Sequence, residues 1–388
     1  MLCSRMLRRR DFLTLLLSTG CGHLLAKQTD PLHNDWPVGK PKDAGFSPTA
    51  LEKLTSALEE GDYPNTHAVL IEYDGQLVYE KYFAGTDERW GRFLGERKFD
   101  ADSLHDLRSA TKSVTSALLG IALSTDFDAA LARPIGSFFP HLKLRPELDA
   151  VILEHVLTMT AGLEWNEMRV PYTDPKNDEL QMSYVEDPIE LVLSRPLREK
   201  PGSTWYYNGG LTQVLAGVVK QVAGKPFDAF AKEALFAPLG ITQYEWLGPP
   251  RWDSHMPSAA SGLRLRARDL ARFGSVYLHR GAWDGQQIVP ETCVDRSAQR
   301  HVPFTHQGPW GYGYQWWVGT LEGYEVVAAC GNGDQRVFIV PKERLAITVF
   351  AGAYNESGGY SDRIFKAVMA ARGKSPRRPQ IQNESPTT

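Results

Sequence analysis

A serine hydroxyl and a lysine amine, those of Ser109 and Lys112, lie three positions apart at the start of an apolar stretch. The residues that follow, among them Val114, Leu118 and Ile121, recur at helical spacing and predict a helix from Ser109 to about residue 123. Side chains at i and i+3 of a helix are neighbours, so the Lys112 amine can reach the Ser109 oxygen near the free N–H groups of the helix start. A serine nucleophile needs a proton acceptor and donors for the oxyanion. The competing interpretation is a helix-capping serine and a solvated lysine.

Two further segments combine polar or reactive side chains with turn-forming residues. Residues 205–208, Trp-Tyr-Tyr-Asn, stand at the entry to a long apolar helix, and residues 329–332, Ala-Cys-Gly-Asn, stand where a strand meets a glycine-rich turn. Taken singly, the first is typical of two core aromatics beside an asparagine cap, and the second of an ordinary β-turn. Their functional interest comes from their order in the chain after Ser109 and Lys112.

The elements that position these residues follow from periodicity and turn signals. Two strand-like runs, at 67–73 and 76–83, flank an Asp-Gly turn and predict a β-hairpin. Three more runs rich in β-branched residues, near the end of the chain, predict an antiparallel meander. Those runs lie at 325–329, 335–340 and 345–351. Predicted helices cover residues 48–60, 109–123, 227–236, 267–279 and 361–372, and the stretch between Asn208 and Gly224.

Strands at both ends of the chain and helices between them predict an α+β fold. The N-terminal hairpin and the C-terminal meander would pair in one antiparallel sheet flanked by helices, with a mainly helical region inserted. We expect a single catalytic domain at 48–372, with a sheet region at 48–108 and 251–372 and a helical region at 109–250. No repeat of fixed period occurs, which argues against a solenoid or a propeller.

The first 26 residues are typical of an export signal rather than of a folded element. Arginines at 8–10 precede a short apolar run at 13–17, in a pattern that resembles a twin-arginine signal. Cleavage before Cys21, with lipidation, competes with cleavage after Ala26, and membrane attachment is expected only in the first case. We therefore expect an exported, periplasmic or extracytoplasmic protein, with an extended lead-in at 27–47 and a disordered tail at 373–388.

Charge and cysteine content exclude several classes of partner and cofactor. The chain of 388 residues has a formal net charge of −3, and loss of residues 1–26, with four arginines and one aspartate, makes it −6. That balance argues against nucleic acid as a partner. The sequence has neither Cys-x-x-Cys nor His-Glu-x-x-His, so no metal and no other cofactor is expected. Cys293 and Cys330 remain after the leader, and spacing does not decide whether they pair.

Taken together and in this order, the three motifs resemble those of the serine β-lactamase and penicillin-binding-protein superfamily. The similarity is greatest to its class C-like branch, with esterases and 6-aminohexanoate-dimer hydrolases. The first motif is Ser-x-x-Lys at 109–112, and the second is Tyr-x-Asn at 206–208. Segments at 157–165, 267–274 and 311–317 also look like this family, and the resemblance covers residues 40–372. It implies a β-lactamase/transpeptidase-like fold and acyl transfer to serine.

The resemblance implies a role for each residue of the first two motifs. Ser109 would be the nucleophile, and Lys112 and Tyr206 would handle its proton, with the base unassigned between them. Tyr206 is preferred over its neighbour because only Tyr206 has an asparagine two positions on. Asn208 would hold Lys112 and the acyl part of the substrate.

The third motif departs from the family pattern. By resemblance, the N–H groups of Ser109 and of Asn332, which follows Gly331, form the oxyanion hole. Ala329, however, stands where β-lactamases and penicillin-binding proteins usually have lysine, so the cation for a substrate carboxylate is missing and efficient β-lactamase activity is not expected. Asp334 stands where similar proteins often have glycine, and we expect its carboxylate to disfavour anionic substrates.

The implied function is that of a serine hydrolase, of the esterase or amidase type, acting on a small-molecule ester or amide. Two alternatives stay open: a D-amino-acid peptidase or carboxypeptidase of the penicillin-binding type, and a non-catalytic sensor or binding protein that keeps a stable acyl adduct. The physiological substrate and the oligomeric state do not follow from the sequence. An α/β-hydrolase is disfavoured because no Gly-x-Ser-x-Gly occurs.

Overall fold

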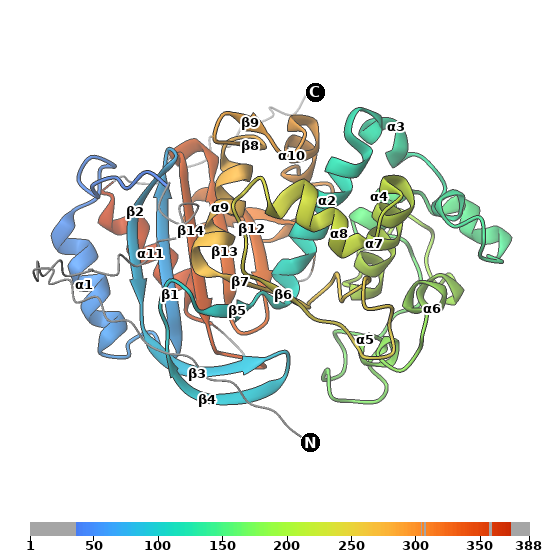
Figure 1. Cartoon of the computed structure of the whole chain (residues 1–388), viewed down its shortest axis with the longest axis horizontal. Helices are drawn as coiled ribbons and strands as arrows, with labels where there is room; N and C mark the ends of the chain where they lie inside the picture. Colours follow the sequence, from blue (N-terminus) through green and yellow to red (C-terminus); the bar gives the residue numbers. More distant parts are fainter. Residues whose placement is uncertain (1–35, 304, 306–307, 357–358, 374–388) are drawn as a thin grey trace, which may run out of the picture. The chain divides into compact units, whose positions relative to one another are not determined.

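An antiparallel sheet of seven strands forms the centre of the fold (Figure 1). Its strand order is β10-β11-β12-β13-β14-β1-β2. The N-terminal hairpin consists of β1 (Thr66–Tyr73) and β2 (Gln76–Tyr82), and the C-terminal meander of β12 (Tyr324–Gly331), β13 (Gln335–Val340) and β14 (Leu345–Ala351). Because β1 pairs with β14, with Val69 opposite Val349, the two ends of the fold share one sheet, as predicted. Two short strands, β10 (Gly311–Tyr312) and β11 (Trp317–Leu321), extend it beyond β12.

The computed structural model describes residues 36–303, 305, 308–356 and 359–373. The predicted export signal, with Cys21, lies outside the described residues, as do the first part of the predicted lead-in and nearly all of the predicted tail. The described residues belong to one compact unit. None of the helices in this part of the chain has the length and apolarity that a membrane crossing requires.

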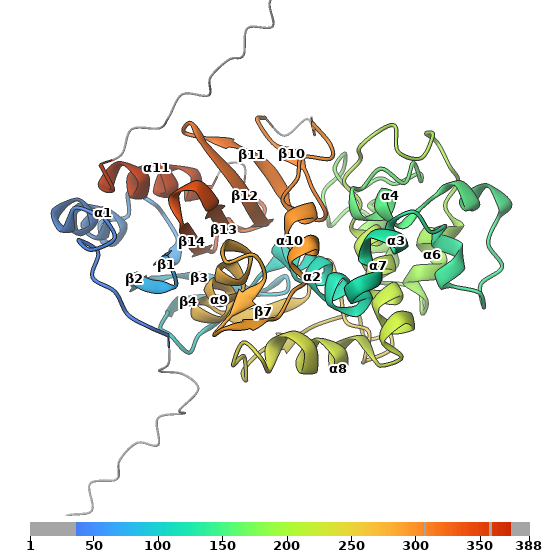
Figure 2. The ribbon, with the colours of Figure 1, turned by 90° about the horizontal axis from the view of Figure 1, so that it is seen from above.

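Helices cover both faces of the sheet (Figure 2). Side chains alternate between the two faces along each strand, so successive residues join different cores. Val69 and Ile71 of β1 join a core with α1 (Pro48–Glu59) and α11 (Ser361–Ala371). Ala68 and Leu70 join the larger core, on the side of α2 (Thr111–Leu123) and α9 (Ala267–Leu278). Burial of both faces explains why this stretch of β1 is continuously apolar instead of alternating.

The helical region packs around α7 (Gly209–Ala223), the long apolar helix that the sequence predicts. This helix contacts α2, α4 (Leu153–Leu157), α5 (Asp178–Met182), α6 (Pro188–Ser194) and α8 (Phe227–Ala231). Asn208 caps its first turn, and Gly224 ends it in the left-handed conformation (φ 62°). A short helix, α3 (Phe127–Leu131), packs beside α2 and α4.

The structure also contains small sheets that the sequence does not predict. A hairpin of β3 (Ala84–Arg89) and β4 (Arg92–Lys98) follows β2, and β5 (Leu104–Asp106), β7 (Leu263–Arg266) and β6 (Glu245–Trp246) form a three-stranded sheet. These strands are either rich in charged residues or very short, so they lack the apolar alternation that marks a strand. Another small hairpin, of β8 (Ala282–Trp283) and β9 (Gln286–Gln287), precedes α10 (Glu291–Ser297).

Two helices differ from the prediction at one end. The helix expected from Ser109 begins as a 3₁₀ turn at Arg108–Ala110 and becomes α-helical only at Thr111. The helix expected at 227–236 continues from α8 into a π-helical turn at Lys232–Phe236. The first difference matters most, because it places Ser109 just ahead of α2 rather than within its first turn.

Candidate active site

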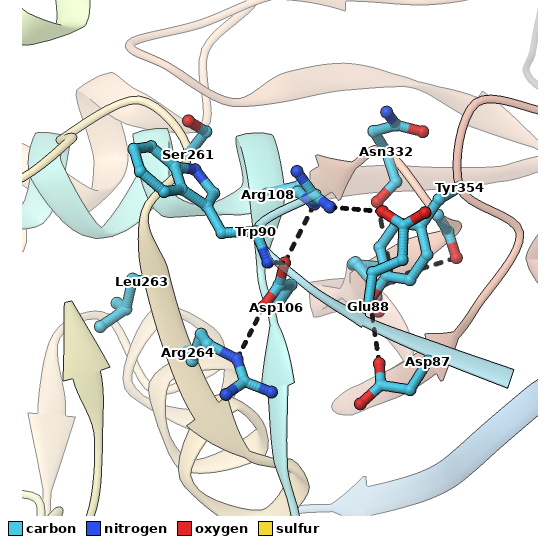
Figure 3. A network of polar contacts seen from close by, with 12 residues as sticks. Asp87, Glu88, Trp90, Asp106, Arg108, Ser261, Leu263, Arg264, Asn332 and Tyr354 are labelled. Atoms are coloured by element: carbon cyan, nitrogen blue, oxygen red, sulfur yellow. Dashed lines mark hydrogen bonds and ion pairs between the residues drawn. The ribbon is translucent and has the colours of Figure 1, made fainter. Parts of the chain in front are cut away.

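Ser109 lies in the 3₁₀ turn between β5 and α2. A polar network around the preceding residue, Arg108, holds this turn (Figure 3). Arg108, the preceding residue, adopts a left-handed conformation (φ 47°) that residues other than glycine rarely take. Its guanidinium donates to Glu88 Oε2 at 2.9 Å, pairs with Asp106 Oδ2 at 3.2 Å and lies 4.9 Å from the centre of the Tyr354 ring. These contacts offset the conformational strain next to Ser109.

Asp106 is the centre of this network. It is almost fully buried, accepts a hydrogen bond from the Trp90 N–H at 2.6 Å and pairs with Arg264 Nε at 2.6 Å. Burial raises the pKa of this carboxyl, and the charges of Arg108 and Arg264 act against the rise. Because β5 carries Asp106 and β7 carries Arg264, the three-stranded sheet fixes the turn that leads into α2.

Lys112 lies beside Ser109, as predicted. Its ammonium donates to Ser109 Oγ at 3.1 Å and to the Ala260 carbonyl oxygen at 3.0 Å, and only 2% of the residue is exposed. Burial lowers the pKa of this ammonium, whereas the charges of Glu179 and Glu167 raise it. A desolvated lysine that is hydrogen-bonded to a serine hydroxyl is suited to accept its proton.

The phenol at this centre belongs to Tyr207 and not, as predicted, to Tyr206. The Lys112 ammonium lies 4.9 Å from the centre of the Tyr207 ring. Burial raises the pKa of the Tyr207 phenol, and the nearby Ser109 hydroxyl opposes the rise. Three groups that can exchange a proton therefore meet at one place.

The side chains of residues 205–208 divide into two pairs, which explains the correction, and Asn208 has an extended backbone (φ −147°, ψ 100°). Successive side chains of an extended segment point to opposite sides. Trp205 and Tyr207 share one side, where both are buried and their ring centres lie 6.2 Å apart. Tyr206 and Asn208 share the other side, and both line a separate pocket of about 340 Å³. A one-residue change of register thus moves both predicted side chains away from Ser109.

Asn208 and Tyr206 have surroundings of their own. Asn208 Oδ1 accepts a hydrogen bond from Leu211 N at 3.1 Å and caps α7, so it does not hold Lys112 as predicted. The Tyr206 hydroxyl is buried without a hydrogen-bond partner in the described part of the chain. The Arg169 guanidinium lies 5.5 Å from the centre of the Tyr206 ring. These contacts separate both residues from the Ser109 centre.

Gly331 brings the end of β12 against the turn that carries Ser109. A Cβ at this position would overlap the Leu107 carbonyl oxygen, so only glycine permits the approach. Asn332 follows Gly331, and its side chain exchanges two hydrogen bonds of 2.8 Å with Asn355. This exchange anchors the segment whose backbone N–H is the predicted second oxyanion donor.

The third motif lacks a lysine, but an arginine lies next to it. The cross-strand partner of Cys330 on β13 is Arg336, whose guanidinium donates to the Gly331 carbonyl oxygen at 3.0 Å and lies 3.5 Å from Asp334 Oδ1. Cys330 and its partner Arg336 lie on the α11 side of the sheet, whereas Ala329 belongs to the larger core on the α2 side, so the expectation of a site without the motif's cation stays a prediction. Cys330 and Cys293 are both free, and burial raises the pKa of the Cys330 thiol to about 11.

Asp334 makes structural contacts, and its predicted effect on substrates stays a prediction. Its carboxylate accepts hydrogen bonds from the Ser361 N–H, at 2.7 Å, and from the Ser361 hydroxyl, at the first residue of α11. Only 6% of Asp334 is exposed. The start of α11 and Arg336 offset part of its charge.

Two glutamates that the sequence analysis does not single out lie close to Lys112. Glu167 is buried and accepts hydrogen bonds from Trp165 Nε1 at 2.8 Å, the Tyr172 hydroxyl at 3.0 Å and the Gly209 N–H at 2.7 Å. Glu179, half-buried on α5, shares a hydrogen bond with Glu167. Burial and the charge of Glu167 raise the pKa of Glu179 to about 7. No local motif marks these glutamates, because they meet only through the packing of α5 against α7.

Known proteins share the sequence features of this chain. The family model described as Beta-lactamase matches residues 56–367. The 6-aminohexanoate-dimer hydrolase of Paenarthrobacter ureafaciens is 26% identical over 313 residues, which cover 76% of this chain and 74% of that protein. The lovastatin esterase of Penicillium rubens is 24% identical over 55% of this chain and 54% of its own length. This chain spans about half the length of most of the curated relatives that it matches.

The fold has solved counterparts. The penicillin-binding protein of Bacillus halodurans superposes with a TM-score of 0.61 at 17% identity, over 83% of this chain and 98% of that chain. At that identity the likeness shows the fold alone, and it confirms the predicted β-lactamase/transpeptidase-like architecture. The family match includes the sheet, the helical region and the Ser109 centre, and the chain therefore belongs to the Beta-lactamase family.

Proposed function

We propose that this protein is a serine hydrolase that cleaves ester or amide bonds of small molecules through an acyl-enzyme on Ser109. One observation carries the proposal: the Lys112 ammonium lies 3.1 Å from Ser109 Oγ and 4.9 Å from the centre of the Tyr207 ring, so a serine, a lysine and a phenol lie together. Relatives named as a dimer hydrolase and as an esterase support this class of reaction.

In the acylation step, Ser109 Oγ forms a bond to the substrate carbonyl carbon while its proton passes to the Lys112–Tyr207 pair. Burial lowers the pKa of Lys112 and raises that of Tyr207, so it eases the loss of a proton from Lys112 and opposes it at Tyr207. The N–H groups of Ser109 and Asn332 would stabilise the oxyanion. The proton then moves to the leaving alcohol or amine as its bond to carbon breaks.

In the deacylation step, water attacks the acyl carbon and its proton passes to the same pair of side chains. The bond between the acyl carbon and Ser109 Oγ breaks, and the proton returns to Ser109. Both steps use only the substrate, water and side chains of this chain, so the proposed cycle is complete without a cofactor.

Labelling by a fluorophosphonate probe and hydrolysis of p-nitrophenyl esters test the proposal. Ser109→Ala should abolish both and leave the thermal unfolding temperature close to that of the wild type. Labelling or hydrolysis that persists in the variant would contradict the proposal. Intact mass spectrometry after incubation with an ester separates a hydrolase, which releases the acyl group, from a sensor, which keeps it.

A peptidase acting on D-amino-acid peptides is the second candidate. The expected export would suit it. Arg336, which lies 3.5 Å from Asp334 and on the face of the sheet opposite to Ala329, does not replace the motif's lysine, and this keeps the esterase or amidase in first place. Comparison of p-nitrophenyl esters, D-amino-acid amides and nitrocefin decides between them, and faster turnover of the peptide analogues would reverse the order.

Export is part of the proposal. Arginines at 8–10 ahead of an apolar run support a twin-arginine signal at residues 1–26. Fusion of this segment to a reporter should direct it out of the cytoplasm, and replacement of Arg8 and Arg9 by lysine should retain it. A reporter that stays in the cytoplasm with the unaltered segment would rule out export by this route.

A further inference from the structure

The residue two positions after Tyr207 is a glycine, and two carboxyl groups lie close to the place that its missing Cβ would take. In a Tyr-x-Asn motif an asparagine follows the tyrosine at this spacing, whereas Tyr207 is followed by Gly209. A Cβ on Gly209 would lie 3.3 Å from Glu167 Oε2 and 3.4 Å from Glu179 Oε1. The two carboxyl groups therefore converge on the space that the asparagine side chain would take.

Glu167 is surrounded by donors. Its oxygens receive hydrogen bonds from the Trp165 indole, the Tyr172 hydroxyl and the Gly209 N–H. The Gly209 N–H belongs to the first turn of α7, where the helix dipole also favours negative charge. Hydrogen bonds of this kind favour the charged form of a carboxyl group. A proton held by the two glutamates therefore resides on Glu179.

Glu179 faces charged groups of both signs. It shares a hydrogen bond with Glu167, and the charges of Lys112 on α2 and of Arg108 on the 3₁₀ turn attract its ionised form. Burial and the charge of Glu167 outweigh that attraction and raise the pKa of Glu179 to about 7. In turn, an ionised Glu179 raises the pKa of Lys112 and adds to the rise in the pKa of Tyr207.

The remaining polar neighbours of Glu179 do not reverse this balance. Tyr172 lies on the side of Glu167, and burial raises the pKa of its phenol, so it stays uncharged. Asp178, the preceding residue on α5, pairs with Arg195 at 2.6 Å. The group that titrates beside Lys112 near neutral pH is thus Glu179.

We propose that Glu167 and Glu179 are positioning residues for the Lys112–Tyr207 pair, holding one proton between them and taking the place of the motif's asparagine beside Lys112. The inference rests on the proposed function, because it concerns proton transfer at Ser109. With Glu179 neutral, the two glutamates present one negative charge to Lys112; with Glu179 ionised, they present two. The second charge stabilises the ammonium and opposes a phenolate, so the Lys112–Tyr207 pair loses its proton at a higher pH.

The pH dependence of kcat/KM tests the proposal in Glu179→Gln, which keeps the shape of the side chain and removes its titration. Above about pH 7 only the wild type has a charge at this position, so kcat/KM should rise at a pH about one unit lower in the variant. Below about pH 6 the side chain at position 179 is neutral in both proteins, and their pH profiles of kcat/KM should coincide. Glu190→Gln, which removes an exposed carboxylate from α6, should keep the wild-type profile.

A purely structural role gives a different outcome. It would lower the plateau of kcat or the unfolding temperature without moving the midpoint of the profile, and that result would overturn the proposal. Should Glu179→Gln fail to fold, Glu167→Gln should shift the midpoint in the same direction, at a lower plateau because an amide cannot accept all three hydrogen bonds. An unshifted midpoint in a folded variant of either kind contradicts the inference.

The fluorophosphonate probe separates this inference from the proposed function. The rate of labelling at Ser109 should show the same shift with pH, because it depends on the same proton transfer. Wild-type protein that resists the probe would remove the proposed function and the inference together. Normal labelling at Ser109, with identical pH profiles for Glu179→Gln and the wild type, would remove the inference alone.

Discussion

The Lys112 ammonium lies over the ring of Tyr207, 4.9 Å from its centre, and both side chains are buried. An ammonium above an aromatic face is attracted by its negative charge density, and the attraction is strongest when water is excluded. The contact therefore holds Lys112 and Tyr207 together while Lys112 donates to Ser109 Oγ. Adjacent to Tyr207 in sequence, Tyr206 takes no part in this arrangement.

The two tyrosines make a matched test of that assignment. Tyr207→Phe keeps the ring under Lys112 and removes the hydroxyl, so kcat/KM for a p-nitrophenyl ester should fall about 100-fold or more. Tyr206→Phe removes a hydroxyl that faces the separate pocket and should leave kcat/KM close to the wild-type value. Equal losses in the two variants would show that the contacts of Tyr207 do not govern the reaction.

The sequence predicts Ser109 and Lys112 because helical spacing alone brings them together. Tyr207 needs more information, since the choice between adjacent tyrosines depends on which side of an extended segment faces the serine. The Tyr-x-Asn motif predicts that Tyr206 faces Ser109, whereas the packing of Trp205 against Tyr207 places Tyr207 on that side. Glu179 could not be predicted for a related reason: it lies on a separate element, and only the packing of α5 against α7 brings it close to Lys112.

The fold likewise contains elements that a local sequence signal predicts and elements that depend on tertiary contacts. The hairpin at β1 and β2, the meander and α7 carry strong local signals, and all are confirmed. The β3–β4 hairpin is rich in charged residues and has no such signal, although Asp87 at its base is buried and Glu88 binds Arg108. Burial of charge in pairs depends on the tertiary partner, so a sequence pattern based on apolar residues does not detect it.

Gly331→Ala tests the close approach of β12 to the serine turn. The added Cβ would overlap the Leu107 carbonyl oxygen, so one of the two backbones must move, at a cost of about 2 kcal/mol of unfolding free energy. The same movement should lower kcat, because Gly331 precedes the predicted oxyanion donor. Gly136→Ala is the control, since its Cβ would meet only the end of the Leu144 side chain at 3.4 Å. Urea unfolding and ester hydrolysis measure both effects, and equal stability of the two variants contradicts the prediction.

Asp106→Asn tests the polar network that holds Arg108 in its left-handed conformation. It removes the charge that pairs with Arg108 and Arg264, although Glu88 and Glu245 still contact these two arginines. We expect a loss of about 2–3 kcal/mol of unfolding free energy, somewhat less than for a buried charge left without any partner. Fluorophosphonate labelling should also slow, because the turn next to Ser109 loses its anchor.

The control for this variant is Asp62→Asn, at an exposed aspartate. It makes the same change in net charge and should alter neither unfolding in urea nor labelling. Destabilisation without any effect on labelling would mean that the network supports the fold but does not position Ser109.

The unfolding free energy should decrease as the pH falls, over a range that the pKa of His67 determines. This imidazole is fully buried and stacks on Phe99, with ring centres 3.9 Å apart. Burial lowers its pKa from 6.5 to about 4 in the folded protein. Between those values the unfolded chain binds a proton that the folded protein does not, so the contribution of His67 is complete above about pH 6.5 and is lost as the pH falls to about 4. The loss amounts to about 3 kcal/mol.

His67→Gln should therefore make the unfolding free energy less dependent on pH between about 6.5 and 4, whatever it does to stability at neutral pH. His105, buried beside it with its pKa lowered by burial, contributes in the same direction and remains in the variant. His255→Gln is the control, because a hydrogen bond to Asp228 raises the pKa of that exposed imidazole and reverses the sign of its effect. Urea unfolding at several pH values gives the slopes, and a slope for His67→Gln as steep as that of the wild type would show that His67 takes up its proton in the folded state.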